Sequence, residues 1–254
     1  MIWRNIKKLL SLIFVLSFVT ACSSSGTNPT EAPETGEPVS GICANDYYPV
    51  LQGATWSYKS TGSPAGDYSF TDTISVVKED GFTLSSKFGE LTRTQEWSCK
   101  EEGLVALQLG GPSAATLNSQ DMNFTLDVKK VEGVTYPREM KPGGTWQHLL
   151  EFEGEMEIAG ETATAEGNAQ TAFTAQGTES VTVPAGTFEA VKVQTDTNIV
   201  FTIQVQGISV PVSFSGTYSY WYAKGVGWVK AEGQGNITGT SFTETIELQS
   251  YEIP

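Results

Sequence analysis

Residues 199–214 read IVFTIQVQGISVPVSF, and the alternation in this stretch decides the fold class. Apolar residues occupy every second position up to Val205, and after Gly207 the alternation resumes in the opposite phase. Alternation with a period of two indicates a strand with one buried face, and the change of phase at Gln206-Gly207 is what a tight hairpin requires. Pro211 cannot donate a hydrogen bond to a neighbouring strand, so we expect its strand to lie at an edge or to be paired on one side there.

Runs of the same kind recur from residue 42 onward, and long helical periodicity is absent. Residues 68–78 and 82–88 flank Asp80-Gly81, a dipeptide typical of hairpins. Residues 217–223 and 240–253 add further strands, and about a dozen are expected in total. We therefore predict an all-β fold, a large antiparallel curved sheet in the form of an open half-barrel or a sandwich.

A short sequence that occurs twice predicts how this sheet is organised. Tyr48-Pro49 precedes a Gly-x-Thr-Trp sequence that ends at Trp56, and Tyr136-Pro137 precedes a second one that ends at Trp146. A strand-rich stretch follows each of them, with the tryptophan placed as a core anchor. We predict one β domain over residues 42–254, with two meander halves, 42–135 and 136–254, packed face to face.

The apolar run from Leu9 to Ala21 indicates where the chain works. It is shorter than the roughly 20 residues of a membrane-spanning helix, and it follows a positively charged start, as in a secretory signal. Val19-Thr20-Ala21-Cys22 resembles the lipobox of bacterial lipoproteins, in which the cysteine thiol accepts a lipid. We predict that residues 1–21 are a signal peptide and that a lipid on Cys22 anchors the exported protein to the outer face of the cytoplasmic membrane, or to the outer membrane of a diderm host. The alternative is a plain signal peptide that ends in a cysteine.

The composition after Cys22 predicts a linker and excludes two classes of partner. Residues 22–41 are rich in Ser, Thr, Pro and Gly with almost nothing apolar, which is typical of a disordered tether. Removal of residues 1–21 takes away three of the 15 Lys and Arg and none of the 29 Asp and Glu, leaving a net charge of about −17. So acidic a chain is not expected to bind nucleic acid or to dock on an anionic lipid surface.

Two cysteines remain once Cys22 is lipidated. Cys43 and Cys99 in an exported chain favour a disulfide, which would fasten the first residues of the domain to a strand near Trp97. In an unusual redox environment both would be free.

Three stretches carry a resemblance to a known family: YYP with GATWSY (residues 47–49 and 53–58), VPAGTFEA (183–190) and YWYAKGVG (220–227). Together they resemble the TapB-like family of bacterial envelope proteins, a domain of unknown function of the 3108-like kind. The resemblance spans most of the mature chain. It implies a β-rich exported domain of the open half-barrel kind seen in lipoprotein carriers, and it brings no catalytic residues with it.

Four alternating glutamates form one candidate site. Glu151, Glu153, Glu155 and Glu157 share one face of a predicted strand, with successive side chains about 6.5–7 Å apart. Such a row suits a hard cation such as Ca²⁺, and the spacing also suits a glycosidase pair. We favour a third interpretation, a solvent-facing strand whose charges discourage aggregation, because no Asp or Asn loop ligands are nearby.

Aromatic residues near the C-terminus form a second candidate site. Tyr218 and Tyr220 share a strand face, Trp221 lies on the other, and Trp228 follows the next turn. Exposed, these rings could stack on sugars or line a cavity for an apolar ligand. Buried, they belong to the core, which is the interpretation that we favour.

Catalytic motifs are missing from the sequence. His148 is the one histidine, there is no H-E-x-x-H or G-x-S-x-G, and we expect His148 to be a surface or structural residue. We therefore predict a non-enzymatic protein without a cofactor. Two functions remain: a lipoprotein that binds an apolar or amphiphilic ligand or an envelope partner, and a carbohydrate-binding or carbohydrate-hydrolysing surface protein.

Overall fold

The computed structural model of the chain describes residues 41–109, 124–158 and 161–254. The predicted signal peptide, Cys22 and nearly all of the predicted linker lie outside these ranges. The described residues form strands and turns without an α-helix, so no helix in them could span a membrane. The strands are β1 (Thr55–Thr61), β2 (Tyr68–Val77), β3 (Gly81–Phe88), β4 (Leu91–Lys100), β5 (Gly103–Ala106), β6 (Phe124–Gly133), β7 (Tyr136–Pro137), β8 (Thr145–Ile158), β9 (Glu161–Val183), β10 (Gly186–Val205), β11 (Ile208–Ala223), β12 (Gly227–Ile237) and β13 (Thr240–Glu252).

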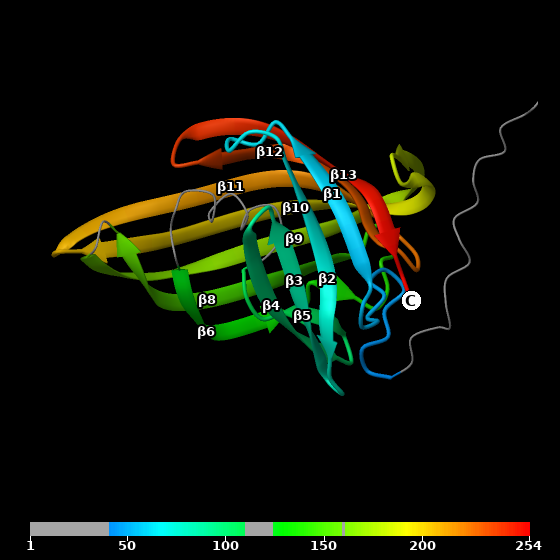
Figure 1. The fold of residues 1–254 in the computed structure, drawn as a ribbon, viewed down its shortest axis with the longest axis horizontal. Coiled ribbons are helices and arrows are strands. Elements are labelled where there is room, and N and C mark those ends of the chain that lie inside the picture. The colour runs from blue at the N-terminus through cyan, green and yellow to red at the C-terminus, as the bar shows by residue number, and fades with distance from the viewer. Residues whose placement is uncertain (1–40, 110–123, 159–160) are drawn as a thin grey trace, which may run out of the picture.

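All 13 strands belong to one antiparallel sheet in the order β6-β8-β9-β10-β11-β12-β13-β1-β2-β3-β4-β5-β7. The sheet bends strongly, and in Figure 1 the strands β1–β5 cross in front of the long strands β8–β11. Val134 and Thr135 link the two edge strands, yet no ladder joins β6 to β7 in the described part of the chain, so the sheet is not closed. The predicted curved antiparallel sheet is thus confirmed as an open half-barrel.

The hairpin predicted from residues 199–214 is present as β10 and β11. Val205 pairs with Ile208, and the two turn residues, Gln206 and Gly207, have φ values of 49° and 79°. Positive φ at both positions is the type I′ geometry whose twist matches that of the flanking strands. Pro211 pairs only with Thr202 on β10, since the pairing of β11 with β12 begins at Phe214. The expectation of one-sided pairing at the proline is therefore confirmed.

The sheet has two arms, β6 with β8–β13 and β1–β5 with β7, which are joined along one edge. β1 pairs with β13 from Thr55↔Glu252 to Thr61↔Thr245, which joins the first strand to the last. The boundary predicted at 135/136 falls between β6 and β7, and each of these strands pairs with a strand of the other half, β8 and β5 respectively. The chain therefore exchanges its two edge strands between the arms.

The core between the arms is built largely from stacked aromatic rings. Tyr48 stacks on four of them, at centroid distances of 4.9–5.8 Å: Trp56, Phe82, Trp97 and Tyr136. Trp56 is 2 % exposed and anchors the core as expected. Trp146 starts β8 but is only partly buried, stacked on Phe173 at 5.2 Å.

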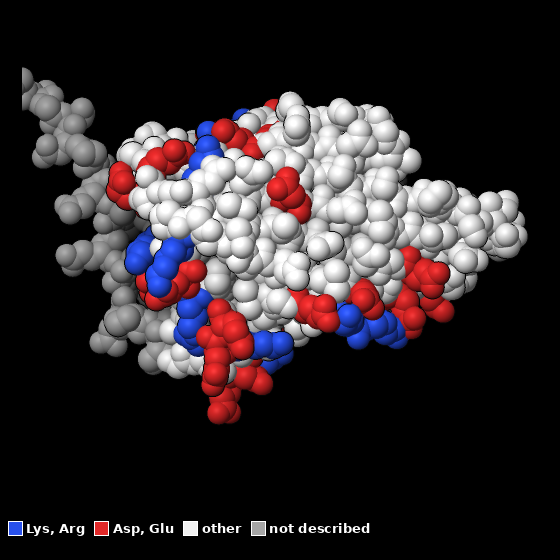
Figure 2. Space-filling model, turned by 180° about the vertical axis from the view of Figure 1, so that it is seen from behind, with Lys and Arg blue, Asp and Glu red and all other residues white. Residues whose placement is uncertain are grey.

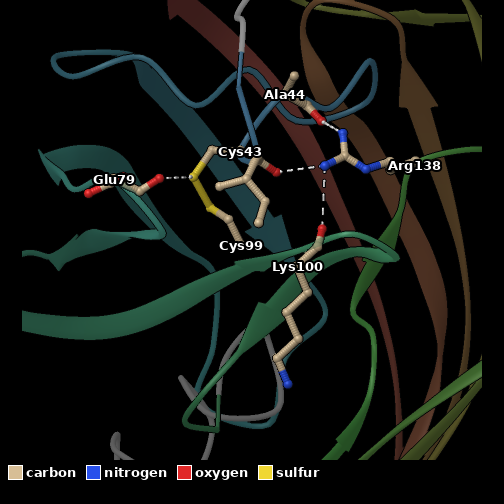
Figure 3. Close-up of a disulfide and its surroundings, with 7 residues drawn as sticks. Cys43, Ala44, Glu79, Cys99, Lys100 and Arg138 are labelled. Carbon is tan, nitrogen blue, oxygen red and sulfur yellow. Dashed lines mark hydrogen bonds between the residues drawn. A yellow bond between two sulfur atoms is a disulfide. The ribbon is translucent and has the colours of Figure 1, made fainter.

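A disulfide and an arginine fasten the start of the described chain to the β4–β5 turn (Figure 3). Cys43 and Cys99 are joined, as expected from the cysteine count. Arg138 donates hydrogen bonds to the carbonyls of Ile42 and Ala44 at 2.8 and 2.9 Å, and others to the carbonyls of Glu101 and Lys100. The first residues of the domain are therefore held both covalently and by a guanidinium.

Candidate ligand-binding site

A cavity of about 170 Å³ lies on the concave face of the sheet, between its two arms. Side chains of β2–β5 line one wall, and side chains of β8–β12 line the other. The apolar lining is mostly aromatic, with Phe70 and Phe88 stacked at 5.1 Å and Trp228 stacked on the buried Tyr58 at 3.9 Å. Rings supply a large apolar surface with few rotatable bonds, so the walls are rigid.

A polar row crosses this apolar wall. Asp72 on β2, Ser86 on β3 and Arg93 on β4 are successive register partners, so their side chains share the concave face. All three line the cavity, and Ser86 Oγ donates a 2.5 Å hydrogen bond to Asp72 Oδ1. Arg93 Nη2 donates to the carbonyl of Leu109. The row thus places a carboxylate, a hydroxyl and a guanidinium side by side.

The two charged groups of the row are not paired with each other. No ion pair joins Asp72 to Arg93, and among the described residues neither has another partner of opposite charge. Burial raises the pKa of the Asp72 carboxyl to about 6, against a smaller lowering by the Ser86 hydrogen bond. Burial likewise lowers the pKa of the Arg93 guanidinium to about 10. Burial therefore disfavours both charged forms, and the described residues supply no compensating charge to either.

A second buried carboxylate, that of Glu244, differs from Asp72 in its hydrogen bonding. Glu244 is 2 % exposed and accepts hydrogen bonds from three hydroxyls: Ser60 at 2.6 Å, Tyr68 at 3.0 Å and Tyr218 at 3.2 Å. Gly233 makes this possible, because a Cβ there would lie 2.8 Å from the Tyr218 ring. Glu244 is a satisfied structural group, whereas Asp72 and Arg93 retain hydrogen-bonding capacity toward the cavity.

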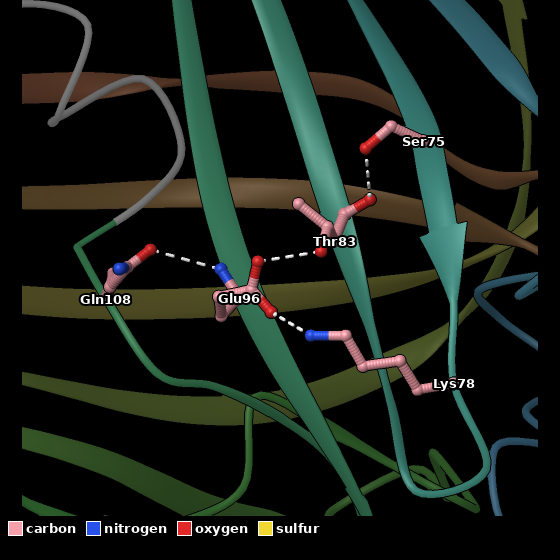
Figure 4. Close-up of polar contacts among 5 residues, drawn as sticks. All are labelled: Ser75, Lys78, Thr83, Glu96 and Gln108. Atoms are coloured by element: carbon pink, nitrogen blue, oxygen red, sulfur yellow. Dashed lines mark hydrogen bonds and ion pairs between the residues drawn. The ribbon is translucent and has the colours of Figure 1, made fainter.

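The segment that follows β5 is held against β4 by hydrogen bonds of Gln108 (Figure 4). Gln108 accepts from the backbone N–H of Glu96 through its side chain, at 3.0 Å, and from Gln95 Nε2 through its carbonyl, at 2.7 Å. The Glu96 carboxylate accepts from Lys78 and Thr83, and these hydrogen bonds lower its pKa. Residues 107–109 are thus fixed at this side of the cavity, and Leu109 is positioned to accept from Arg93.

His148 has a structural place in the cavity wall. Its Nε2 lies 2.9 Å from the carbonyl of Ala106, and burial lowers the pKa of its imidazole. Cys43 and Cys99, which could have served it as nucleophiles, are joined in the disulfide. His148 therefore ties β8 to β5, in agreement with the structural role expected of it.

The predicted aromatic residues separate into two groups. Tyr220 and Trp228 line the cavity, and Tyr218 is 4 % exposed beside it, bonded to Glu244. Trp221 points to the opposite face, where Lys192 and Lys230 lie 4.8 and 5.1 Å from its ring centroid and Glu179 accepts from its Nε1 at 2.7 Å. Trp221 and Trp228 are 4 % and 7 % exposed. These rings form core and cavity wall, and they offer no open platform for stacking on a sugar.

The predicted glutamate row lies on the convex face. Glu151, Glu153 and Glu155 are exposed, and the first two form ion pairs with Lys130 and Lys129 of β6. The side chain of Glu157 lies outside the part that the structure describes. No group of three or more His, Cys, Asp or Glu that could hold a metal occurs among the described residues, so the cation site stays a prediction.

One stretch of the chain carries no charged residue. No Asp, Glu, Lys or Arg occurs from residue 197 to residue 223, which covers most of the β10–β11 hairpin. Figure 2 shows charged side chains gathered along other parts of the surface, while the projecting end of the molecule is uncharged. Ile208 and Val210 near the hairpin turn are 63 % and 43 % exposed.

Asp72 and Arg93 were missed by the sequence analysis, although a signal for each existed. Asp72 has the same parity as Phe70 and Ile74, and Arg93 has the same parity as Trp97 and Cys99. Each charged residue therefore falls on the face of its strand that the apolar residues mark as buried. A buried charge without an obvious structural partner is the feature that points to a site.

The motifs behind the family resemblance have a structural role. Asp46, next to the first motif, binds the turn of the third, since Lys224 Nζ lies 3.1 Å from its carboxylate and Gly225 N–H donates to its carbonyl at 2.7 Å. In the Val-Pro-Ala-Gly turn, the Ala185 N–H donates a hydrogen bond to the carbonyl of Leu248, and Gly186 adopts the positive φ that the turn requires. The motifs therefore hold turns at one end of the sheet, and they also contribute Tyr48, Tyr220 and Tyr222 to the wall of the cavity.

Comparison with known proteins identifies a family and two similar structures. The sequence model of the DUF3108-like family matches residues 74–242. A crystal structure from Bacteroides fragilis, of a protein inferred to be exported and with a YmcC-like fold, is 15 % identical and aligns over 82 % of this chain and 100 % of its own, with a TM-score of 0.48. One from Parabacteroides distasonis, inferred to be a lipoprotein, is 16 % identical over 82 % and 99 %, with a TM-score of 0.46. No curated protein sequence matches.

Proposed function

The chain belongs to the DUF3108-like family, and on that premise we propose that it is a non-catalytic, lipid-anchored envelope protein that holds a small apolar or amphiphilic ligand. The ligand lies in the cavity on the concave face of the sheet. Export and anchoring are supported by the predicted signal peptide of residues 1–21, which Cys22 directly follows, and by the Cys43–Cys99 disulfide, which suits an oxidising compartment. Family membership by itself brings no activity.

One observation carries the binding proposal: the cavity combines rigid aromatic walls with a few buried polar groups that have capacity to spare. This is the composition of ligand sites in general. A volume of about 170 Å³ is close to the roughly 150 Å³ of an engineered cavity that takes up benzene. The ligand portion inside the cavity is therefore about one ring or a short alkyl segment.

Native mass spectrometry tests this proposal. The full chain with Cys22→Ser is purified from its host without detergent and sprayed under non-denaturing conditions. We expect a bound species whose mass disappears on denaturation, and whose occupancy falls in a variant that fills the cavity, Ala106→Phe. An empty protein that also takes up no small apolar probe would overturn the proposal. Ser57→Ala, on the face of β1 that points away from the cavity, is the control.

A second role, contact with an envelope partner, is favoured by the uncharged β10–β11 hairpin with its exposed Ile208 and Val210. Exposed apolar residues that lie together are a common mark of interaction surfaces. A photo-crosslinking residue at position 208, in cells of the host, is expected to capture one defined product. The same residue at Leu91, which is 47 % exposed on the β3–β4 turn, should give none. Equal labelling at both positions would contradict this role.

The carbohydrate function has less support. It needs exposed aromatic rings beside paired acids, whereas Tyr218, Trp221 and Trp228 are buried and the glutamates lie on the opposite face from the cavity. The ligand-binding function is the one that we propose.

A further inference from the structure

We propose that the cavity selects monoanionic amphiphiles, with Arg93 binding the anionic group and the neighbouring aromatic pair holding the apolar part. This inference rests on the proposed function and deepens it, because it names the chemical class of the ligand. It follows from three features of the polar row: a cation without an ion-pair partner among the described residues, the position of the carboxylate and the apolar residues beside the row.

Arg93 is the one Lys or Arg among the described residues that line the cavity. A guanidinium has five N–H donors, and in the described part of the chain one bond is formed, to the carbonyl of Leu109. Burying a cation without a carboxylate is costly, and burial lowers the pKa of this guanidinium. A planar anionic group entering the cavity would supply the missing partner, with bidentate geometry available to it.

Asp72 limits the charge that the ligand can carry. It is the one Asp or Glu among the described lining residues, and it lies two strands from Arg93, which is about 10 Å between backbones. Its Oδ1 is engaged by Ser86. Among the described residues, Tyr251 Oη is the one solvent-inaccessible side-chain polar atom that has no hydrogen-bond partner. The second carboxylate oxygen of Asp72, which also has no such partner, is therefore accessible. A second negative group on the ligand would meet this carboxylate, which favours monoanions over dianions.

The apolar end of the ligand has a defined place. Phe70 and Phe88 lie one step along β2 and β3 from Asp72 and Ser86, on the same face, with their rings 5.1 Å apart. Leu84 lies on the other side of the polar row and also lines the cavity. A ligand with its anionic group at Arg93 therefore has apolar surface nearby for the rest of its structure.

The test uses two probes of the same shape, 3-phenylpropanoate and 3-phenylpropan-1-ol. Both are titrated calorimetrically into the full chain with Cys22→Ser at pH 7. We expect the acid to bind at least about tenfold more tightly than the alcohol, as a charge-assisted pair would give. Arg93→Gln should abolish this preference, because it weakens binding of the acid far more than binding of the alcohol. Lys87→Gln makes the same charge change on the exposed face of β3 and should preserve the preference.

Asp72→Asn should change the affinity for the acid in the opposite direction to Arg93→Gln. Removing the carboxylate should strengthen binding of the acid several-fold, with a smaller effect on the alcohol, and it decides the question if Arg93→Gln fails to fold. Equal affinity of the two probes for the wild-type cavity would overturn this inference and leave the proposed function standing. If neither probe binds, and native mass spectrometry finds the protein empty, both are overturned.

Discussion

Trp56 Nε1 donates a 2.6 Å hydrogen bond to the carbonyl of Val226, 170 residues further along the chain. Two residues along the same strand, Tyr58 Oη donates to the carbonyl of Trp228 at 2.9 Å. The glycine between these acceptors, Gly227, has a φ of 112° and lies against the Trp56 ring, where a Cβ would come within 3.5 Å of Nε1. Strand β1 is thus fastened to the start of β12 as well as to its sheet neighbours.

Trp56→Phe should destabilise the fold by about 2–4 kcal/mol, because it leaves the buried carbonyl of Val226 without its donor and opens space beside Gly227. Trp146→Phe is the matched control. Trp146 is only partly buried, and its hydrogen bond to the carbonyl of Thr135 is 3.3 Å long, so a smaller loss is expected. The measurement is the free energy of unfolding from urea titration. Equal losses would show that the β1–β12 contact has no special weight.

Reduction of the disulfide should lower the free energy of unfolding by about 4 kcal/mol, since Cys43 and Cys99 are 56 residues apart and the closed loop restricts the unfolded chain. Urea titrations with and without a phosphine reductant measure the difference. The double variant Cys43→Ala/Cys99→Ala should match the reduced wild type and be insensitive to the reductant. A wild type equally stable in both conditions would contradict this prediction.

Asp72 should make stability fall as the pH rises. The folded-state pKa of its carboxyl, about 6, lies above the ordinary value of 3.8, so between these values the folded chain binds a proton that the unfolded chain has released. The resulting loss on going from about pH 4 to pH 7 is on the order of 3 kcal/mol. His148 acts in the other direction, because its lowered pKa favours the fold at higher pH.

The comparison between wild type and Asp72→Asn isolates the Asp72 contribution, because the other groups are common to both. The variant should gain stability relative to wild type above pH 6 and show little difference below pH 4. Thermal or urea unfolding across this range measures it. A constant difference at every pH would indicate that the Asp72 carboxyl titrates normally.

Cys22→Ser should convert the protein from membrane-bound to released, without preventing export. The prediction follows from the lipobox, since the thiol is the group that accepts the lipid. Fractionation of host cells, with metabolic labelling by a palmitate analogue, measures both anchoring and modification. A wild-type protein that carries no label would leave the plain signal peptide as the explanation, and a labelled variant would show that the lipid is attached to a group other than Cys22.

Local pattern was enough to predict much of the fold. The β10–β11 hairpin and the β2–β3 hairpin follow from alternation and from turn residues within a few positions of each other. One-sided pairing at Pro211 could be predicted because it depends on a single missing N–H.

Long-range pairing could not be predicted in this way. The join of β1 to β13 and the exchange of β6 and β7 between arms depend on registers among strands far apart in the chain. The polar row needs two such registers at once, Asp72↔Ser86 and Ser86↔Arg93, before its residues are seen to be neighbours. The repeated Tyr-Pro and Gly-x-Thr-Trp sequences indicate two similar strand starts, and they carry no information on how the edges of the two halves meet.

The fastening at Cys43 has a mechanical consequence. A tensile load applied to the chain ahead of residue 42 would pass through the sulfur–sulfur bond into β4 and through the Arg138 guanidinium into the β4–β5 turn. The load would reach β1 only after these two attachments. Strand β1, which joins the two arms, would therefore not be pulled out of the sheet first. If the predicted linker tethers the domain, tension would act on a point that is fixed covalently and by hydrogen bonds, away from the strands that shape the cavity.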